Sequence, residues 1–259
     1  MLYRYPTTHL QKAKFWLMGH DFIGAAIRFA HFKKILKKIP FFKDVLDAGS
    51  GTGDFSFYLA EKYPSCSISA YDINKKTFEQ NIIAQKHMNI SNIIFSENNL
   101  LHLQEKEKYD LIISICTLIY FSKDKTKDVL MRLTHALRKG GYLYLDLPQQ
   151  NFLEINYTPI KYYPKHFQAL QDENSGDLYS FEEIKNMLTA LGYDLIHTNK
   201  SFSYPGKFAW EMDNILKEKN FLRLRWFLLP LFKIFAWLDA TTKHKKGSCF
   251  VVLARKRAS

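Results

Sequence analysis

A glycine-rich turn at residues 47–53 constrains the fold of this chain more than any other feature. The turn reads Asp-Ala-Gly-Ser-Gly-Thr-Gly, follows a short apolar run that begins at Asp44, and precedes a helical pattern that begins at Asp54. Glycine has no Cβ and readily adopts positive φ, so a strand that passes through such a turn into a helix lets a ligand approach the backbone closely. The turn therefore predicts a ligand site at the carboxyl end of a buried strand.

The spacing of the glycines separates this turn from that of a dinucleotide enzyme. The dinucleotide fingerprint is G-x-G-x-x-G, and its third glycine would fall on Asp54. The chain instead carries Asp47 two residues before Gly49, and Asp72 at the end of the next apolar run. In the alternative interpretation these acids only satisfy a turn and cap a helix. That interpretation requires the glycine turn, both acids and the order of the strands to coincide by chance.

Apolar runs alternate with helical patterns over most of the chain. Strands are predicted at 44–48, 67–72, 93–96, 109–116, 142–147, 193–202 and 248–254, and helices at 54–63, 75–87, 124–137 and 181–191. We expect Gly140-Gly141 to cap the third of these helices and Gly192 to cap the fourth. The alternation predicts a parallel, doubly wound sheet with helices on both faces.

Residues 44–148 resemble the class I (Rossmann-like) S-adenosylmethionine-dependent methyltransferase family. The resemblance rests on the glycine turn, the two acids that flank it and the order of the strands. It implies an α/β fold with a mostly parallel seven-stranded sheet whose last strand is antiparallel. It also implies S-adenosyl-L-methionine as the cofactor and methyl transfer as the reaction.

In that family the turn packs against the methionine part of the cofactor, and the acid that ends the second strand holds the ribose hydroxyls. A carboxylate suits a diol because it accepts two charge-assisted hydrogen bonds. The family usually has an aspartate beside the adenine, where this chain has Asn98-Asn99-Leu100, and we expect the Asn99 amide oxygen to accept from the exocyclic amine. The implied cofactor-binding residues are Asp47, Gly49, Ser50, Gly51, Thr52, Gly53, Asp72, Ile73, Asn98, Asn99, Leu100, Ile115 and Cys116.

The chain offers a few candidates for a catalytic base. Methyl transfer from a sulfonium has a good leaving group, so positioning and desolvation can supply much of the catalysis without a base. If the acceptor is a hydroxyl, the candidates are His166, Tyr120 and Tyr163, with His20 as a residue of an N-terminal lid. His166 ranks first because it follows the fifth strand, where the family commonly builds its acceptor pocket. The alternative is that the tyrosines pack and the histidines lie on the surface.

The segment 221–238 is dense in Leu, Phe and Trp but contains Arg223, Arg225, Lys233 and Pro230. These charges argue against a transmembrane helix. At 100° per residue the three cations share an arc of about 160°, which leaves an apolar face, and Pro230 is expected to kink the helix or split it in two. The pattern predicts a helix at an anionic membrane surface. The alternative is a helix in the core or at a dimer interface that covers the edge of the sheet.

Charge and cysteine content bound the partners and the compartment. The chain has 37 Lys+Arg against 25 Asp+Glu, a net charge of +12, which suits a membrane surface, a nucleic acid or an acidic substrate. A nucleic-acid methyltransferase is disfavoured because Tyr120-Phe121 lacks the prolines of the motif that holds a flipped base. The three cysteines have neither disulfide nor metal spacing, so we predict no metal and a reducing compartment. The N-terminus lacks the apolar core of a signal peptide, which favours the cytoplasm, including the inner face of the membrane.

We therefore predict a methyltransferase core at 41–204 and 247–259, an N-terminal helical lid or cap at 1–40, and a hydrophobic helical insertion at 205–246. The predicted function is methyl transfer from S-adenosylmethionine to a hydrophobic or lipid-linked small molecule at the membrane surface. The alternatives are a nucleic-acid methyltransferase and a non-catalytic cofactor-binding scaffold of a biosynthetic complex, acting through residues 205–246.

Overall fold

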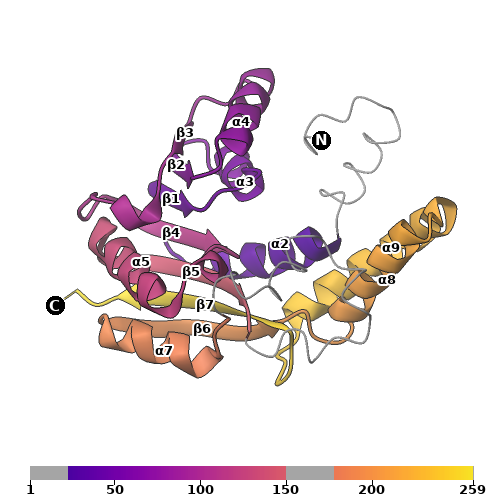
Figure 1. Cartoon of the computed structure of the whole chain (residues 1–259). Coiled ribbons are helices and arrows are strands. Elements are labelled where there is room, and N and C mark those ends of the chain that lie inside the picture. The colour runs from indigo at the N-terminus through magenta and orange to yellow at the C-terminus, as the bar shows by residue number, and fades with distance from the viewer. Residues whose placement is uncertain (1–22, 150–177, 259) are drawn as a thin grey trace.

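The computed structural model describes residues 23–149 and 178–258, and its centre is a seven-stranded sheet (Figure 1). The order of the strands is β3-β2-β1-β4-β5-β7-β6. The strands are β1 (Asp44–Ala48), β2 (Ser67–Asp72), β3 (Ile93–Glu97), β4 (Tyr109–Ile115), β5 (Leu137–Pro148), β6 (Tyr193–Ser201) and β7 (Cys249–Lys256). Strands β1 to β5 pair in parallel, whereas β7 is antiparallel to both of its neighbours, β5 and β6. The predicted fold class is confirmed.

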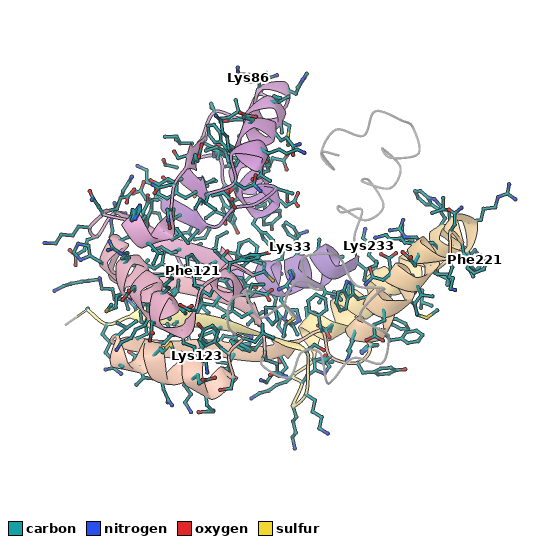
Figure 2. The ribbon with its side chains drawn as sticks, in the orientation of Figure 1. Lys33, Lys86, Phe121, Lys123, Phe221 and Lys233 are labelled. Carbon is teal, nitrogen blue, oxygen red and sulfur yellow. The ribbon has the colours of Figure 1, made fainter. Side chains whose placement is uncertain are left out.

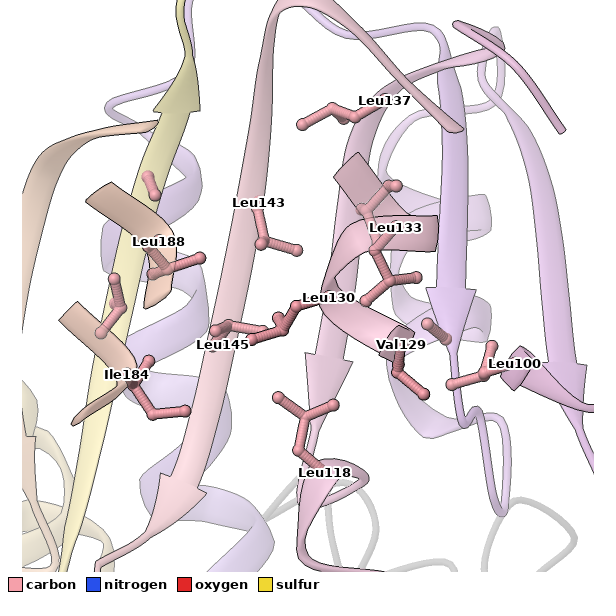
Figure 3. Packing of buried hydrophobic residues seen from close by; sticks show 14 of the residues in the cluster. Leu100, Leu118, Val129, Leu130, Leu133, Leu137, Leu143, Leu145, Ile184 and Leu188 are labelled. Carbon is pink, nitrogen blue, oxygen red and sulfur yellow. The ribbon is translucent and has the colours of Figure 1, made fainter. Parts of the chain in front are cut away.

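Helices cover both faces of the sheet because successive strand residues point to opposite sides. Val45 belongs to one buried cluster and Leu46 to the other. The Val45 side is covered by α2 (Ile23–Leu36), α3 (Asp54–Lys62) and α4 (Lys75–His87). The Leu46 side is covered by α5 (Lys123–Ala136) and α7 (Phe181–Ala190). Figure 3 shows this second cluster, in which leucines of α5 meet Leu143 and Leu145 of β5.

The predicted boundaries hold to within one or two residues, except at the start of β5 and at the helix predicted over 221–238, which continues to Thr241. Gly140 and Gly141 do not cap a helix, because α5 ends at Ala136 and β5 begins at Leu137. Leu137 pairs with Tyr109, and the register then shifts before Leu111 pairs with Tyr142. Gly140, at φ +74°, lies inside this irregular stretch. Gly192 does follow the last turn of α7, at φ +83°, as predicted.

Three helices pack together around a third apolar cluster. These are α2, α8 (Gly206–Glu218) and α9 (Leu222–Thr241), and the cluster includes Trp210, Leu229 and Phe232. Helix α9 continues through Pro230, so the predicted split is wrong. Proline fits the helical φ and removes one backbone donor, while the residues that follow it still pack against the cluster. None of the helices that the structure describes is long and apolar enough to cross a membrane.

Candidate cofactor and acceptor site

The loops that follow β1, β2 and β3 meet at one edge of the sheet. The backbone N–H groups of Gly49 and Ser50 donate to the Tyr71 carbonyl oxygen at 2.8 and 2.9 Å. The N–H of Asn98 donates to the Asp72 carbonyl oxygen at 2.9 Å. Because the carboxyl ends of parallel strands lie on the same edge, residues far apart in sequence converge there.

Gly49 joins this edge to the loop after β4. It has φ +83°, and a Cβ at this position would lie 2.2 Å from Oγ1 of Thr117. The Thr117 hydroxyl also donates to the Ala48 carbonyl oxygen at 3.0 Å. Only glycine fits here, because both the dihedral angle and the close approach exclude a side chain.

Gly51 forms the open side of the turn. A Cβ on Gly51 would meet nothing within 4 Å. Its N–H donates to Oδ2 of Asp72 at 2.7 Å, and its carbonyl oxygen accepts from Nδ2 of the buried Asn81 at 2.8 Å. The turn therefore presents exposed backbone beside a carboxylate.

Asp72 keeps hydrogen-bonding capacity for a ligand. Its Oδ1 accepts from the N–H of Asn74 at 2.8 Å, and its Oδ2 accepts from Gly51. A carboxylate has about four acceptor positions, so two remain for a pair of hydroxyls. The carboxylate and the open turn beside it fit the ribose and methionine parts of S-adenosylmethionine.

Asp47 lies beneath the turn, with 3% of its surface exposed. Burial raises its pKa to about 7, and the charges of Asp72 and Asp54 add to this effect. The hydroxyl of Ser56 opposes it by donating to Oδ2 of Asp47 at 2.6 Å. A cationic group bound nearby favours the ionised form of such an acid.

The remaining cofactor candidates differ in their surroundings. The Thr52 hydroxyl donates to the Asp54 carboxylate at 2.8 Å, and Ile73 is 68% exposed. The Asn99 amide oxygen accepts from the N–H of Leu101 at 3.0 Å and thereby caps the short helix η1 (Leu100–His102). Its pairing with adenine therefore stays a prediction.

Leu100 is buried in the core, while Ile115 and Cys116 end β4 beside the turn. Cys116 has φ +54°, an uncommon conformation for a residue other than glycine. Sparsely populated backbone conformations cluster at ligand sites. This conformation is consistent with the role that the family resemblance implies for Cys116.

Of the catalytic candidates, Tyr120 is the one that the structure describes. It lies in the short helix η2 (Leu118–Tyr120) and is 62% exposed. Partial burial raises its pKa, and the charges of Cys116 and Asp72 add to the effect. Tyr120 therefore stays protonated at neutral pH and suits hydrogen-bond donation better than proton abstraction. His20, Tyr163 and His166 lie outside the described residues.

A buried ion pair at the end of β5 did not emerge from the sequence. The guanidinium of Arg28, on α2, contacts the fully buried carboxylate of Asp146 and lies 3.8 Å from Sγ of Cys249. The backbone N–H of Cys116 donates to the Asp146 carbonyl oxygen at 2.8 Å, so the pair adjoins the end of β4. An isolated acid within the apolar run 142–147 is the sequence signal that points to it. Only 8% of Arg28 is exposed, so the ion pair is closed to solvent.

Ser56 and Asn81 were also missed. Both are helical residues whose side chains reach back to the glycine turn, where Ser56 holds Asp47 and Asn81 holds Gly51. Neither has a motif of its own. The signal available in sequence is their position on the two helices, α3 and α4, that follow the first two strands.

The comparisons with known proteins agree with this geometry. Residues 43–186 match the family described as "Methyltransferase domain". Malonyl-[acyl-carrier protein] O-methyltransferase from Acetivibrio thermocellus is 28% identical over 116 residues, which cover 44% of this chain and 39% of that protein. The chain spans between 24% and 40% of the length of the first curated relatives that it matches.

Solved structures share the fold at low sequence identity. A putative sarcosine dimethylglycine methyltransferase from Galdieria sulphuraria has a TM-score of 0.62 at 13% identity and covers 90% of this chain and 86% of its own. Magnesium protoporphyrin IX methyltransferase from Synechocystis, solved with bound S-adenosylhomocysteine, has a TM-score of 0.55 at 15% identity and covers 97% of this chain and 89% of its own.

The sheet order, the antiparallel β7 and the glycine turn flanked by two acids define a class I S-adenosylmethionine-dependent methyltransferase. The chain belongs to the methyltransferase-domain family, and S-adenosylmethionine is its cofactor. When bound, the cofactor supplies an electrophilic methyl group on a sulfonium. The glycine turn and Asp72 would bind and orient it. The end of β4 lies beside the turn, and the end of β5 lies beside that of β4.

Proposed function

We propose that this methyltransferase transfers a methyl group to a hydrophobic or lipid-linked small molecule at a membrane surface. One observation carries the proposal: helix α9 directs a row of apolar side chains outward, while Arg225 and Asp239 on the same helix are buried. Leu224, Phe227, Leu231, Ile234 and Trp237 are between 42% and 81% exposed. They recur at steps of three and four residues and therefore form one stripe, which we call the α9 stripe.

Two charged residues of α9, Arg225 and Asp239, are hydrogen-bonded inside the protein, whereas Arg223 is exposed and Lys233 is half-buried. Arg225 is 3% exposed, and its Nε lies 2.5 Å from Oδ1 of the buried Asp213. The sequence interpretation placed Arg225 with Arg223 and Lys233 on the charged face of a helix at a membrane surface, and this placement is wrong for Arg225. An ion pair with a residue of α8 overrides the helical wheel, because a buried charge without a partner is costly.

The carboxylate of Asp239 is also fully hydrogen-bonded inside the protein. It is fully buried, and its oxygens accept from Nε2 of His31 at 2.9 Å, from the N–H groups of Phe202 and Ser203, and from the Ser203 hydroxyl. These contacts fix the rotation of α9 about its axis. The α9 stripe is thereby held outward, and an exposed apolar patch of this kind indicates an interaction surface.

The relatives support a carrier-linked or bulky acceptor. By name, one acts on malonyl-[acyl-carrier protein] and another on magnesium protoporphyrin IX. Neither name assigns a substrate to this chain. Together with the α9 stripe, they favour an apolar acceptor over a nucleic acid.

The test is flotation with vesicles that contain anionic lipid, combined with transfer of labelled methyl groups from S-adenosylmethionine into a fractionated cell extract. We expect label in the lipid fraction. Phe227→Glu with Ile234→Glu should abolish flotation, because both changes lie on the α9 stripe. Ile83→Glu with Ile94→Glu is the matched control, since it adds the same charge outside α9 at residues that are 51% and 63% exposed. These substitutions are better than deletion of 221–238, which would also remove the buried Phe232 and Arg225.

Unchanged flotation of the double variant would overturn the membrane part of the proposal. Label in RNA or DNA in place of lipid would establish a nucleic-acid methyltransferase. Cofactor binding without transfer to any fraction would indicate the non-catalytic scaffold.

A further inference from the structure

A groove lies between helices α2 and α9, on the side of α2 that faces away from the sheet. Its volume is about 790 Å³. Most of its floor is apolar, with Phe29 and Ala30 contributed by α2 and Leu229, Ile234 and Trp237 by α9. The volume falls within the range of about 300–1,000 Å³ that is usual for small-molecule sites. The groove is therefore large enough for a hydrocarbon chain.

Lysines border this apolar floor. Lys33 lines the groove from α2, Lys37 lines it from the turn just after α2, and Lys233 lines it from α9. Figure 2 labels Lys33 and Lys233 on the two helices. None of these three forms an ion pair with a carboxylate of residues 23–149 or 178–258. Lys34, also at the groove, donates to the Ala240 carbonyl oxygen at 2.8 Å.

Lys33 and Lys233 lie close enough to repel each other, and no carboxylate of the described residues is paired with either. Nζ of Lys33 lies 5.0 Å from the ring centre of Tyr58 and 5.6 Å from that of Phe29, which holds the ammonium over the apolar surface. Burial lowers the pKa of Lys33. Burial also lowers the pKa of Lys233, and repulsion from Lys33 adds to that effect. An anion placed between these two lysines relieves the repulsion.

We propose that the α2–α9 groove binds one anionic phospholipid of the membrane, with an acyl chain along the apolar floor and the phosphate between Lys33 and Lys233. The inference rests on the proposed membrane function and names the lipid that this surface would recognise. Ile234 and Trp237 belong both to the α9 stripe and to the groove. A bilayer that covers the stripe therefore places lipid at the mouth of the groove.

Charge complementarity favours a lipid over a second copy of the chain and over residues 1–22. A second copy of the chain that docked through this face would bring the same lysines toward their counterparts, and such like-charge contacts are costly. Residues 1–22 are also a poor complement to the lysines, because they carry Arg4, Lys12 and Lys14 against Asp21. An anionic lipid supplies both the charge and the apolar chain that the groove lacks.

The groove is connected to the cofactor turn by a pair of aromatic rings. Phe29, in the groove, stacks on Phe55 with ring centres 4.1 Å apart. Phe55 lies in the first turn of α3, two residues after Gly53. An acyl chain packed on Phe29 would therefore stiffen the support of the turn that binds the cofactor.

Trp237 provides a local probe, since it lines the groove and is 59% exposed. Vesicles of phosphatidylglycerol with brominated acyl chains should quench its emission, and brominated phosphatidylcholine should do so far less. Trp237→Phe should remove this quenching, which assigns the quenched emission to Trp237. Lys33→Gln with Lys233→Gln should weaken binding about fivefold for each lysine, or about 25-fold together. Lys86→Gln with Lys245→Gln removes the same charge outside the groove and should change binding less than twofold.

A second experiment omits the membrane. Dodecyl phosphate below its micelle concentration should bind the full chain in calorimetric titration, and dodecyl maltoside should not. Ala30→Trp fills the groove and should abolish this binding. Thermal midpoints and cofactor affinity of each variant should match those of the parent protein, which excludes misfolding as the cause.

The two experiments separate failure of the groove from failure of the membrane function. Binding of dodecyl phosphate that depends on Lys33 and Lys233, without any vesicle flotation, supports the groove and overturns the membrane function. Flotation that needs Phe227 and Ile234 but is unaffected by the lysine pair and by Ala30→Trp overturns the groove. A dimer in sedimentation velocity that Ala30→Trp dissociates would assign the groove to a second copy and would also overturn the inference.

Discussion

The cofactor edge and the α8–α9 insertion both use aspartates, but they use them in opposite ways. At the cofactor edge Asp72 accepts two backbone hydrogen bonds and is partly exposed, so half of its acceptor capacity remains for a ligand. In the insertion Asp239 is fully buried, and four donors occupy its two oxygens. An acid alone therefore does not mark a ligand site. The carboxylate must also keep acceptor positions that no protein donor occupies.

The largest effect that we expect is a loss of stability when Asp239, the fully hydrogen-bonded aspartate, is removed. Asp239→Ala leaves buried donors on Phe202 and Ser203 without a partner, so it should lower the free energy of unfolding by about 3–5 kcal/mol. Urea denaturation measures the change. Asp194→Ala is the control, because the Asp194–Arg257 ion pair is exposed and such pairs contribute about 0–1 kcal/mol. A loss below about 1 kcal/mol for Asp239→Ala would contradict the structural role.

The second prediction concerns Asp72, the aspartate that keeps free acceptor positions for a ligand. Asp72→Ala should weaken binding of S-adenosylmethionine at least about 100-fold, because two charge-assisted hydrogen bonds are lost at roughly 1.5–3 kcal/mol each. Calorimetric titration measures the affinity. Asp72→Asn keeps an acceptor oxygen, so its affinity for the cofactor should lie between those of the parent protein and Asp72→Ala. If Asp72→Ala bound within about threefold of the parent protein, the ribose assignment would fail.

A third prediction separates two glycines of the same turn. Gly49→Ala should lower the free energy of unfolding by about 2–3 kcal/mol, because positive φ and the contact with Thr117 act together. Gly51→Ala meets open space, so its cost should be about 1 kcal/mol, while its added methyl group should reduce cofactor affinity. Denaturation and titration of both variants check the pair. Equal losses of stability in the two variants would show that the contact with Thr117 adds nothing to the cost of a side chain at Gly49.

The smallest effect that we expect is the release of a proton from Asp47 when the cofactor binds. With a pKa of about 7, Asp47 is about half protonated at pH 7, and the sulfonium and ammonium groups of the cofactor favour its ionised form. Cofactor binding at pH 7 should therefore release up to about half a proton. Titrations in two buffers with different ionisation enthalpies measure this release, and Asp47→Asn should remove it.

The same group affects stability with a defined sign. The pKa of Asp47 is higher in the folded state than its ordinary value of 3.8, so the folded protein holds more protons than the unfolded chain between about pH 4 and pH 7. The free energy of unfolding therefore falls as pH rises through this window. Asp47→Asn should flatten that slope. An unchanged slope in the variant would contradict the raised pKa.

Local patterns predicted the cofactor half of the molecule. The helix at 75–87 and the strand at 67–72 match the structure residue for residue, because their periodicity is set by the burial of neighbouring side chains. The turn glycines, Asp47 and Asp72 lie together at one sheet edge, since parallel strands bring their carboxyl ends together. Their individual roles as cofactor ligands stay predictions.

Long-range partners explain what the sequence left open. A helical wheel assigns Arg225 to solvent because it contains no information about Asp213 on the preceding helix. Arg28 pairs with Asp146, 118 residues later, and the one local trace of that pair is an acid in an apolar strand. Gly140 was misassigned because a positive φ serves an irregular strand as well as a helix cap.

The position of β7 in the sheet has a consequence for the order of assembly during synthesis. Strand β7 lies between β5 and β6, although it comes later in the chain than either. While the ribosome is still translating α9, β6 has no neighbour in the sheet, whereas β1 to β4 can already pair. The cofactor edge can therefore form early, while β6 waits for residues 249–256. During that interval the open edges of β5 and β6 are the parts of the nascent chain most exposed to wrong pairing.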